Sequence, residues 1–215
     1  MNFLEISNLE VSPMVDSQFV VPSRVTFNQN GVKRTWDYIK AHDAVAILLF
    51  NTTKQAFILV KQFRPALYMA INERVNSEDI SVLEKKEKEL KISVPFEKGV
   101  SYELCAGIVD KDCTLVEIAQ AEILEETGYQ VSINKIKPLF EYNAVGFSGN
   151  LTTVFFAEVT DEMIVNEGGG NKHDGEFIEL FYLPIKDAKE FIYNNDYPKT
   201  SSVSAAIGWY FLNYS

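Results

Sequence analysis

The sequence contains few cysteines and no long apolar run. Cys105 and Cys113 are the only cysteines among 215 residues, and no second Cys/His pair near them would complete a zinc site. No apolar stretch approaches the roughly 20 residues that span a bilayer. The first residues, MNFLEISNLE, lack the basic start and apolar run of a secretory signal. We therefore expect a soluble, cytoplasmic protein with two free thiols and no membrane partner.

Positive charge is also scarce in this chain. Lysine and arginine number 20 against 30 aspartates and glutamates, which gives a net charge of −10 and a pI of about 4.8. This balance argues against a nucleic-acid backbone or an anionic membrane as the partner. The glycines at 168–170 are not followed by Lys-Ser/Thr, which excludes a P-loop. A polyanionic substrate would therefore need local cations or a bound metal.

The chain has enough apolar residues to form a packed core. Hydrophobic residues make up 47% of the sequence and aromatic residues 13%, which suffices for one domain with an appended element. Asn30-Gly31 predicts a hairpin turn between strands at 19–27 and 34–40. The apolar runs 44–50 and 56–63 predict a second hairpin with both faces buried.

The rest of the chain mixes strand and helix patterns. Further strands are expected at 101–107, 131–142, 151–159 and 176–183, and closing helices at 186–193 and 200–213. Residues 72–99 are highly charged, and a surface helix at about 79–91 without chemical function is expected there. This order of elements predicts an α+β fold built on a mixed sheet.

A helix rich in carboxylates follows the strand at 101–107. Thr114 and Glu117 have the spacing of a capping box, so the helix should begin at Leu115 and end at Gly128. Its stripe of Val116, Ala119 and Ile123 would seat it on a sheet and leave the carboxylates on a free face.

Three of its glutamates share one third of the helix surface. Glu122 and Glu126 lie one above the other, and Glu125 flanks them. Anions near a helix C-terminus are disfavoured by the helix dipole, so an offsetting interaction is expected. A hard cation such as Mg²⁺ or Ca²⁺ prefers such oxygen ligands. The alternative is a solvated acidic face, because glutamate is a strong helix former.

The segment GIVDKDCTLVEIAQAEILEETGY, residues 107–129, resembles the signature of the Nudix hydrolases. Cys113 and Ala121 depart from that signature, at positions where the family has Glu and Arg. Neither is among the family's main metal ligands. The positions that match in register are Gly107, Glu122, Ile123, Glu125, Glu126, Gly128 and Tyr129.

The similarity extends over nearly the whole chain from about Trp36. The segments that look like the uridine diphosphate glucose pyrophosphatase branch, close to the ADP-ribose pyrophosphatases, are 59–68, 103–110, 146–161, 168–170 and 198–200. The resemblance implies a Nudix-type α/β/α sandwich over residues 41–215, with a charged insertion at 72–99. It also implies an N-terminal strand extension, residues 1–40, that helps to form a homodimer whose halves complete each other's substrate pocket.

The same resemblance implies a metal site and a base. The cofactor would be Mg²⁺, with Mn²⁺ as an alternative, and the ligands would be Glu122, Glu125, Glu126 and the carbonyl of Ala106. Glu125 would thus belong to both the metal site and the catalytic centre, and Glu176 would be the general base. Glu176 has an alternative interpretation as an ordinary turn acid at a strand start.

Three further residues are candidates for substrate binding. Arg64 suits an anion clamp because its guanidinium offers paired donors, and its alternative is a structural salt bridge. Trp36 would stack on the uracil or on a partner chain, or else belong to the core. Gly146 would shape the pocket through its backbone, or simply form a tight turn.

These features together indicate an enzyme acting on a small nucleotide sugar. The expected reaction is magnesium-dependent hydrolysis of UDP-glucose to UMP and glucose 1-phosphate, with ADP-ribose as the second substrate candidate. A different class stays open, because the departures at Cys113 and Ala121 also fit a domain that binds a nucleotide sugar without turning it over.

Overall fold

A computed structural model describes residues 3–12, 14, 17, 20–76 and 92–214. The helix expected at about 79–91 lies outside the described residues. A helix that the sequence did not predict, α1 (Pro65–Asn76), directly precedes that gap. Proline suits the first position of a helix, because its missing N–H needs no partner there.

Seven strands form one mixed sheet around β3 (Ala44–Asn51). β3 pairs antiparallel with β4 (Ala56–Phe63) and parallel with β8 (Leu151–Val159). The order is β5-β4-β3-β8-β7, with β6 added to β3 and β9 to β4. This arrangement confirms the expected α+β class. The remaining strands are β5 (Val100–Glu103), β6 (Cys105–Ile108), β7 (Lys137–Asn143) and β9 (Ile178–Pro184).

Two of the expected strand boundaries were wrong. The segment 101–107 is divided at Leu104 into β5 and β6, which pair with different neighbours. The strand expected from residue 131 begins only at Lys137, since a 3₁₀ turn, η2 (Ile133–Lys135), occupies the preceding residues. The other 3₁₀ turns are η1 (Phe96–Gly99), η3 (Asp161–Met163) and η4 (Lys172–Asp174).

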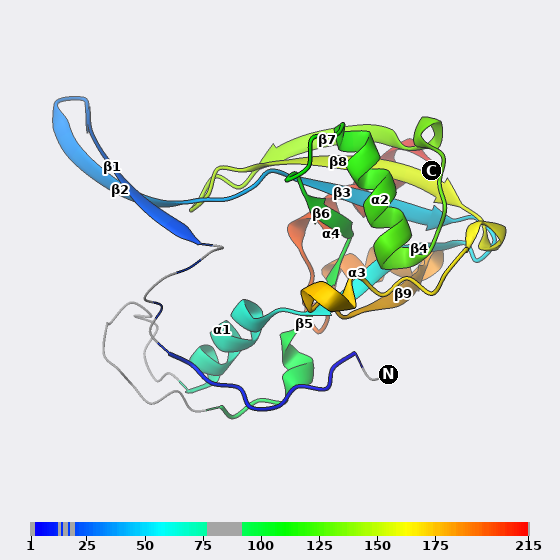
Figure 1. Cartoon of the computed structure of the whole chain (residues 1–215), viewed down its shortest axis with the longest axis horizontal. Coiled ribbons are helices and arrows are strands. Elements are labelled where there is room, and N and C mark those ends of the chain that lie inside the picture. Colours follow the sequence, from blue (N-terminus) through cyan, green and yellow to red (C-terminus); the bar gives the residue numbers. More distant parts are fainter. Residues whose placement is uncertain (1–2, 13, 15–16, 18–19, 77–91, 215) are drawn as a thin grey trace.

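The sheet is covered by helices on both faces. In β3, the odd-numbered residues from Val45 to Leu49 pack in one core with α2 (Leu115–Thr127). The even-numbered residues from Ala46 to Phe50 pack in a second core with α3 (Ile185–Tyr193) and α4 (Ser201–Asn213). Figure 1 shows α2 on the near side of the sheet and the last two helices behind it. The expected α/β/α sandwich is therefore confirmed.

Both ends of α2 are fixed as the sequence predicted. The Thr114 hydroxyl accepts a hydrogen bond from the Glu117 amide, and the Glu117 carboxylate accepts one from the Thr114 amide. Gly128 ends the helix with φ +75° and donates its N–H to Leu124. The buried stripe is centred on Ile118, Ala119 and Ile123.

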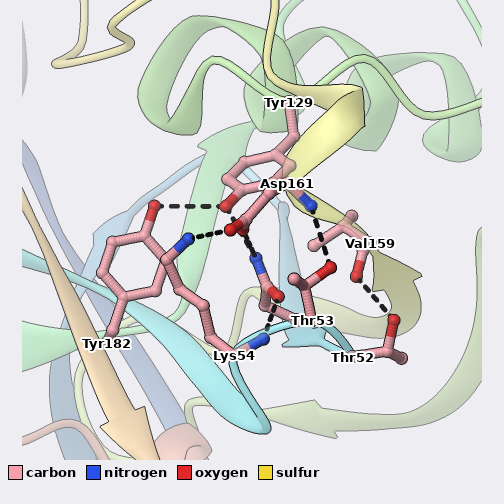
Figure 2. A network of polar contacts seen from close by, with 8 residues as sticks. Thr52, Thr53, Lys54, Tyr129, Val159, Asp161 and Tyr182 are labelled. Atoms are coloured by element: carbon pink, nitrogen blue, oxygen red, sulfur yellow. Dashed lines mark hydrogen bonds and ion pairs between the residues drawn. The ribbon is translucent and has the colours of Figure 1, made fainter.

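A buried polar network fixes the chain immediately after α2 (Figure 2). Nδ2 of Asn51, at the end of β3, donates to the Tyr129 hydroxyl at 2.9 Å and to Asp161 at 2.7 Å. The Tyr129 hydroxyl lies 3.1 Å from that of Tyr182 on β9. Lys54 donates its backbone N–H to Asn51 and pairs through its ammonium group with Asp161. The network therefore ties Tyr129, just after α2, to β3, β9 and η3.

The expected first hairpin is present but does not join the main sheet. β1 (Val21–Gln29) and β2 (Val32–Lys40) pair only with each other among the described residues. They are joined through Asn30 and Gly31, both at positive φ. Figure 1 shows this hairpin extending away from the sandwich. The Ile39 amide donates to the Phe147 carbonyl at 2.8 Å, which links β2 to the loop between β7 and β8.

Asp43, the last of the three residues between the hairpin and the main sheet, makes two hydrogen bonds that join other elements. The carbonyl of Asp43 accepts from the Val109 amide at 2.8 Å, and its carboxylate accepts from the Leu151 amide at 2.8 Å. Asp43 therefore joins the end of β6 to the start of β8.

Across the described residues, no helix combines the length and apolar character needed to cross a membrane.

The C-terminal cap of α2 allows a direct test of this packing. A methyl group on Gly128 would overlap the carbonyl oxygen of Asn166 and would place a non-glycine residue at φ +75°. We expect Gly128→Ala to lower the free energy of unfolding by about 2 kcal/mol or more, measured by urea denaturation.

Gly208→Ala is the matched control, because Gly208 lies inside α4 with open space around its Cα. Alanine is the better helix former by about 1 kcal/mol, so this variant should be neutral or slightly stabilised. Equal losses in the two variants would contradict the role given to the cap.

Candidate active site

A cavity of about 960 Å³ opens where β4, β6, α2 and the segment after η4 meet. Five of the residues selected from the sequence contribute to its wall: Arg64, Ala106, Glu122, Glu125 and Glu176. They come from positions up to 112 residues apart, between Arg64 and Glu176. The fold therefore gathers a cation, three carboxylates and a backbone carbonyl at one opening.

The three glutamates of α2 differ strongly in their exposure. Glu125 is exposed and Glu122 is half-buried, whereas Glu126 is only 3% exposed. Oε2 of Glu126 accepts a hydrogen bond from the Ala106 amide at 3.1 Å. The expectation of one free carboxylate face was therefore wrong for Glu126, because the helix turns this side chain onto β6.

Gly107 is required by the close approach of Glu122. A Cβ atom on Gly107 would overlap the Glu122 carboxylate. The absence of a side chain on β6 thus leaves the space in which this carboxylate lies, which gives the glycine of the signature a steric reason.

The environment raises the pKa of two of these carboxyl groups. Burial raises the pKa of Glu126 to about 8, and the charges of Glu176 and Glu122 add to that effect, against hydrogen bonds from Cys105 and Ala106. Burial, followed by the charge of Glu125, raises the pKa of Glu122 to about 7, although Lys111 opposes this. Like charges and low solvation therefore disfavour the ionised state at both sites.

This donor set has the chemistry that a hard divalent cation requires. In the part of the chain that the structure describes, none of the three glutamates forms an ion pair with Lys, Arg or His. A cation would offset the burial and the like-charge repulsion that raise the pKa values of Glu122 and Glu126. The described side chains do not form a closed group of three or more His, Cys, Asp or Glu arranged to hold a metal ion. The carbonyl of Ala106 and the glutamates fit such an ion in chemistry, and their role as ligands stays a prediction.

Arg64 makes the structural ion pair that was one of its two interpretations. Its Nε and Nη2 donate to the two carboxylate oxygens of Glu103, both at 2.7 Å. Burial opposes ionisation of Glu103, but the hydrogen bonds from Arg64 and Ser101 outweigh it and hold the pKa of Glu103 below its usual range. The Arg64 side chain is still 51% exposed and lines the cavity. The ion pair therefore orients the guanidinium, and its use as an anion clamp stays a prediction.

Glu176 lies at the rim of the cavity in a defined local structure. Its Oε2 accepts from the Asn171 amide at 3.2 Å, and its own amide donates to the Asn171 carbonyl at 3.0 Å. A Cβ on Gly170 would lie 2.8 Å from the same Oε2. The side chain is thus placed by the glycine-rich loop, while its role as a base stays a prediction.

Two of the selected residues lie outside this cavity within one chain. Trp36 is on β2 and is 50% exposed, so its interpretation as a core residue was wrong. Gly146 lies in the exposed loop between β7 and β8, with open space around its Cα. Their predicted contacts with substrate are not tested by this arrangement.

Several residues at the site were not found from the sequence. Glu103 gave no signal in the sequence, because its ion pair with Arg64 forms only once β5 lies beside β4, where Glu103 is opposite Val60. Gln62 did carry a signal in the sequence, since it is a polar residue at an inward position of an apolar strand. The N-terminal segment also contributes to the cavity wall, through Phe3, Glu5, Ile6 and Ser7.

Comparison with known proteins identifies the family. No protein-family model matches the chain. The uridine diphosphate glucose pyrophosphatase NUDT14 of Bos taurus is 38% identical over 209 residues, covering 96% of this chain and 94% of that protein. The chain belongs to the Nudix hydrolase family. The NUDT14 enzyme of Mus musculus matches with the same identity and coverage.

Other relatives of this Nudix hydrolase agree with the assignment. The GDP-mannose pyrophosphatase of Escherichia coli O9:H4 (strain HS) is 34% identical over 151 residues, 70% of this chain and 64% of that protein. The crystal structure of an ADP compounds hydrolase superposes with a TM-score of 0.63 at 14% identity, covering 96% of this chain and 94% of the other. At that identity the structure supports the Nudix fold alone. The predicted family and enzyme class are thus confirmed.

The raised pKa of Glu126 predicts a pH dependence of stability in the metal-free Nudix protein. Glu126 binds a proton in the folded state between its ordinary pKa of about 4.5 and about 8, so folding stability is lost as the pH rises through this window. One group changes the free energy of unfolding by at most about 1.4 kcal/mol per pH unit. We expect the Tm in EDTA to fall by up to about 5 °C per unit between pH 6 and 8.

Glu126→Gln is the control for this measurement, because the amide does not titrate. Its Tm should depend less on pH over the same range, and Mg²⁺ should flatten the dependence of the wild type by replacing the proton. Parallel pH profiles for the variant and the wild type in EDTA would refute the assignment of this dependence to Glu126.

Proposed function

We propose that this Nudix hydrolase cleaves the diphosphate of a nucleoside diphosphate sugar, with UDP-glucose as the first substrate and UMP and glucose 1-phosphate as products. The observation that carries the proposal is the match to two uridine diphosphate glucose pyrophosphatases over 96% of the chain. The cavity supports it, because an arginine, and carboxylates that could hold a divalent cation, suit a substrate with two linked phosphates. The E. coli relative makes GDP-mannose a second candidate, alongside ADP-ribose.

The proposed cofactor is Mg²⁺, with Mn²⁺ as an alternative. When bound, such an ion neutralises phosphate charge and lowers the pKa of a coordinated water. Glu122, Glu125, Glu126 and the Ala106 carbonyl would hold it. The high pKa values of Glu122 and Glu126 support this assignment, since both groups gain most from a nearby positive charge.

Three residues of the chain would then bind the diphosphate, accept a proton and orient the attacking water. Arg64, held in place by Glu103, would direct its free guanidinium edge to the diphosphate oxygens. Glu176 would accept a proton from the attacking water, for which a carboxylate within hydrogen-bond reach suffices. Glu125 is exposed to the cavity and would orient that water beside the ion.

The proposed organisation has an N-terminal extension, residues 1–40, for dimerisation and a Nudix domain, residues 41–215, with a charged insertion at 72–99. The β1–β2 register supports it, because the exposed large apolar residues of the hairpin all lie on one face. The opposite face carries the Arg24–Asp37 ion pair and the Thr26–Thr35 contact. An isolated two-stranded hairpin is marginally stable in water, so a second copy of the chain would cover the apolar face. The exposed residues on it are Val21, Val25, Phe27, Val32 and Trp36.

A homodimer would also give a role to the two selected residues outside the cavity. Trp36 and Gly146 lie on segments joined by the Ile39–Phe147 hydrogen bond. In a dimer they would contact substrate in the cavity of the other subunit. The two free cysteines, Cys105 and Cys113, support a reducing cytoplasm as the location.

A substrate screen tests the proposed reaction. We expect UDP-glucose to be hydrolysed in Mg²⁺ at low enzyme concentration, ahead of ADP-ribose and GDP-mannose, with UMP and glucose 1-phosphate seen by chromatography. Glu126→Gln should lower kcat by about 100-fold or more while changing ligand affinity modestly. A wild type that binds these compounds without turning any over would favour the non-catalytic binding domain instead.

The apolar face of the hairpin provides the test of dimerisation. Val25→Asp with Phe27→Asp places two charges on that face, and we expect light scattering after gel filtration to show monomers in place of dimers. Thr26→Asp, on the opposite face of the same strand, is the control and should leave the dimer intact. A monomeric wild type would refute the proposed assembly.

A further inference from the structure

Gln62 breaks the apolar pattern of β4 at the cavity. Along this strand, Ile58 and Val60 face the core that contains α2. Alternation places the next two residues of the same face at Gln62 and Arg64. Both line the cavity. The inward face of β4 thus changes from apolar to polar where it leaves the core and reaches the candidate active site.

The amide oxygen of Gln62 is buried without a hydrogen-bond partner among the described residues. The residue is 9% exposed, and its Oε1 accepts no hydrogen bond from the residues that the structure describes. It is the one buried side-chain oxygen or nitrogen in that state across the described chain. A buried acceptor left unpaired costs about 1 to 3 kcal/mol. Leucine or methionine at this position would continue the core and avoid that cost.

The surroundings of Gln62 indicate which kind of group could donate a hydrogen bond to its Oε1. Its neighbours across the sheet are Ser101 on β5 and Ile178 on β9. The Ser101 hydroxyl is already used by Glu103, and Ile178 has an apolar side chain. The cavity wall also carries donors on Ser7, Arg64, Lys111 and Asn171, but none of them bonds to Oε1, and Arg64 is engaged with Glu103. A donor for Oε1 would therefore come from a ligand.

We propose that Gln62 is a substrate-binding residue whose amide oxygen accepts a hydrogen bond from a hydroxyl or N–H group of the nucleotide sugar, an inference that rests on the proposed function. The diphosphate is not the donor, because its oxygens only accept. The donor belongs to the hexose or to the nucleoside, both of which carry hydroxyl or N–H groups. Gln62 thus sets specificity beside Arg64, which contacts the phosphates.

The test compares stability with substrate affinity in Gln62→Leu. This change removes the unpaired acceptor and keeps a similar volume, so the Tm should stay the same or rise. The KM for UDP-glucose should rise by about tenfold with little change in kcat, as expected when a hydrogen bond made throughout the reaction is lost. An unchanged KM would overturn the proposal, including the case in which solvent satisfies the amide.

Gln120→Leu is the matched control. Gln120 lies on α2, and its Nε2 donates to the Val131 carbonyl at 2.6 Å, so its amide is already used within the fold. The same substitution there should lower the Tm and leave the KM unchanged. A glutamine with a purely structural role at position 62 would behave like Gln120.

A binding measurement separates this inference from the proposed function. In a Glu126→Gln background, calorimetry with UDP-glucose, UDP and inorganic pyrophosphate would compare Gln62 with Leu at position 62. Weaker binding of UDP-glucose alone assigns the donor to the hexose, and weaker binding of both nucleotides assigns it to the nucleoside. The proposal would be overturned if Gln62→Leu changed the affinity for neither UDP-glucose nor UDP. It would also be overturned if the substitution weakened the binding of pyrophosphate. If the wild type hydrolyses no nucleotide sugar, the proposed function fails while this comparison still tests the contact.

Discussion

The buried carboxylate of Glu126 is the constraint on which the rest of the site depends. It lies between α2 and β6 with no cationic partner among the described residues, and burial raises its pKa to about 8. Holding such a group inside the protein requires that the helix cannot move to expose it. The capping box at Thr114, the left-handed turn at Gly128 and the network around Asn51 together fix α2 against the sheet.

The same constraint explains why neighbouring positions have small or absent side chains. Gly107 leaves space for Glu122, and Gly168 lies so close to the end of α2 that a Cβ would come 2.5 Å from the Glu126 carbonyl. Gly169 and Gly170 then donate their amides to the carbonyls of Glu126 and Glu125. The glycine-rich loop thus satisfies the last carbonyls of the helix and carries Glu176 to the cavity.

Much of the fold could be predicted from local patterns. The hairpin at Asn30-Gly31, the buried strands at 44–50 and 56–63 and both ends of α2 follow from turn, hydrophobic and capping signals that lie within a few residues of one another. α1 was missed because its sequence, PALYMAINERVN, has a weak amphipathic pattern and merges into the charged segment. The division of 101–107 into two strands was missed since it depends on pairing with strands far away in the sequence.

The site shows the same division between local and distant information. The spacing of the glutamates with Gly107 led to the family, yet it gave no indication that Glu126 would be buried and Glu125 exposed, because that depends on how the helix rotates on the sheet. The ion pair of Arg64 with Glu103 likewise forms only when β5 lies beside β4, two strands that are distant in the sequence. Gln62 had a local signal, because it is a polar residue at an inward position of an apolar strand. The sequence did not show that this position lines the cavity.

Asp43 links the hairpin to the loop that follows β6 and to the start of β8. Three residues separate the end of β2 at Lys40 from the start of β3 at Ala44. The last of them holds the amide of Val109, two positions after Gly107, and the amide that opens β8. Through these two hydrogen bonds, the position of the hairpin is coupled to the backbone two residues beyond Gly107, whose missing side chain leaves room for Glu122.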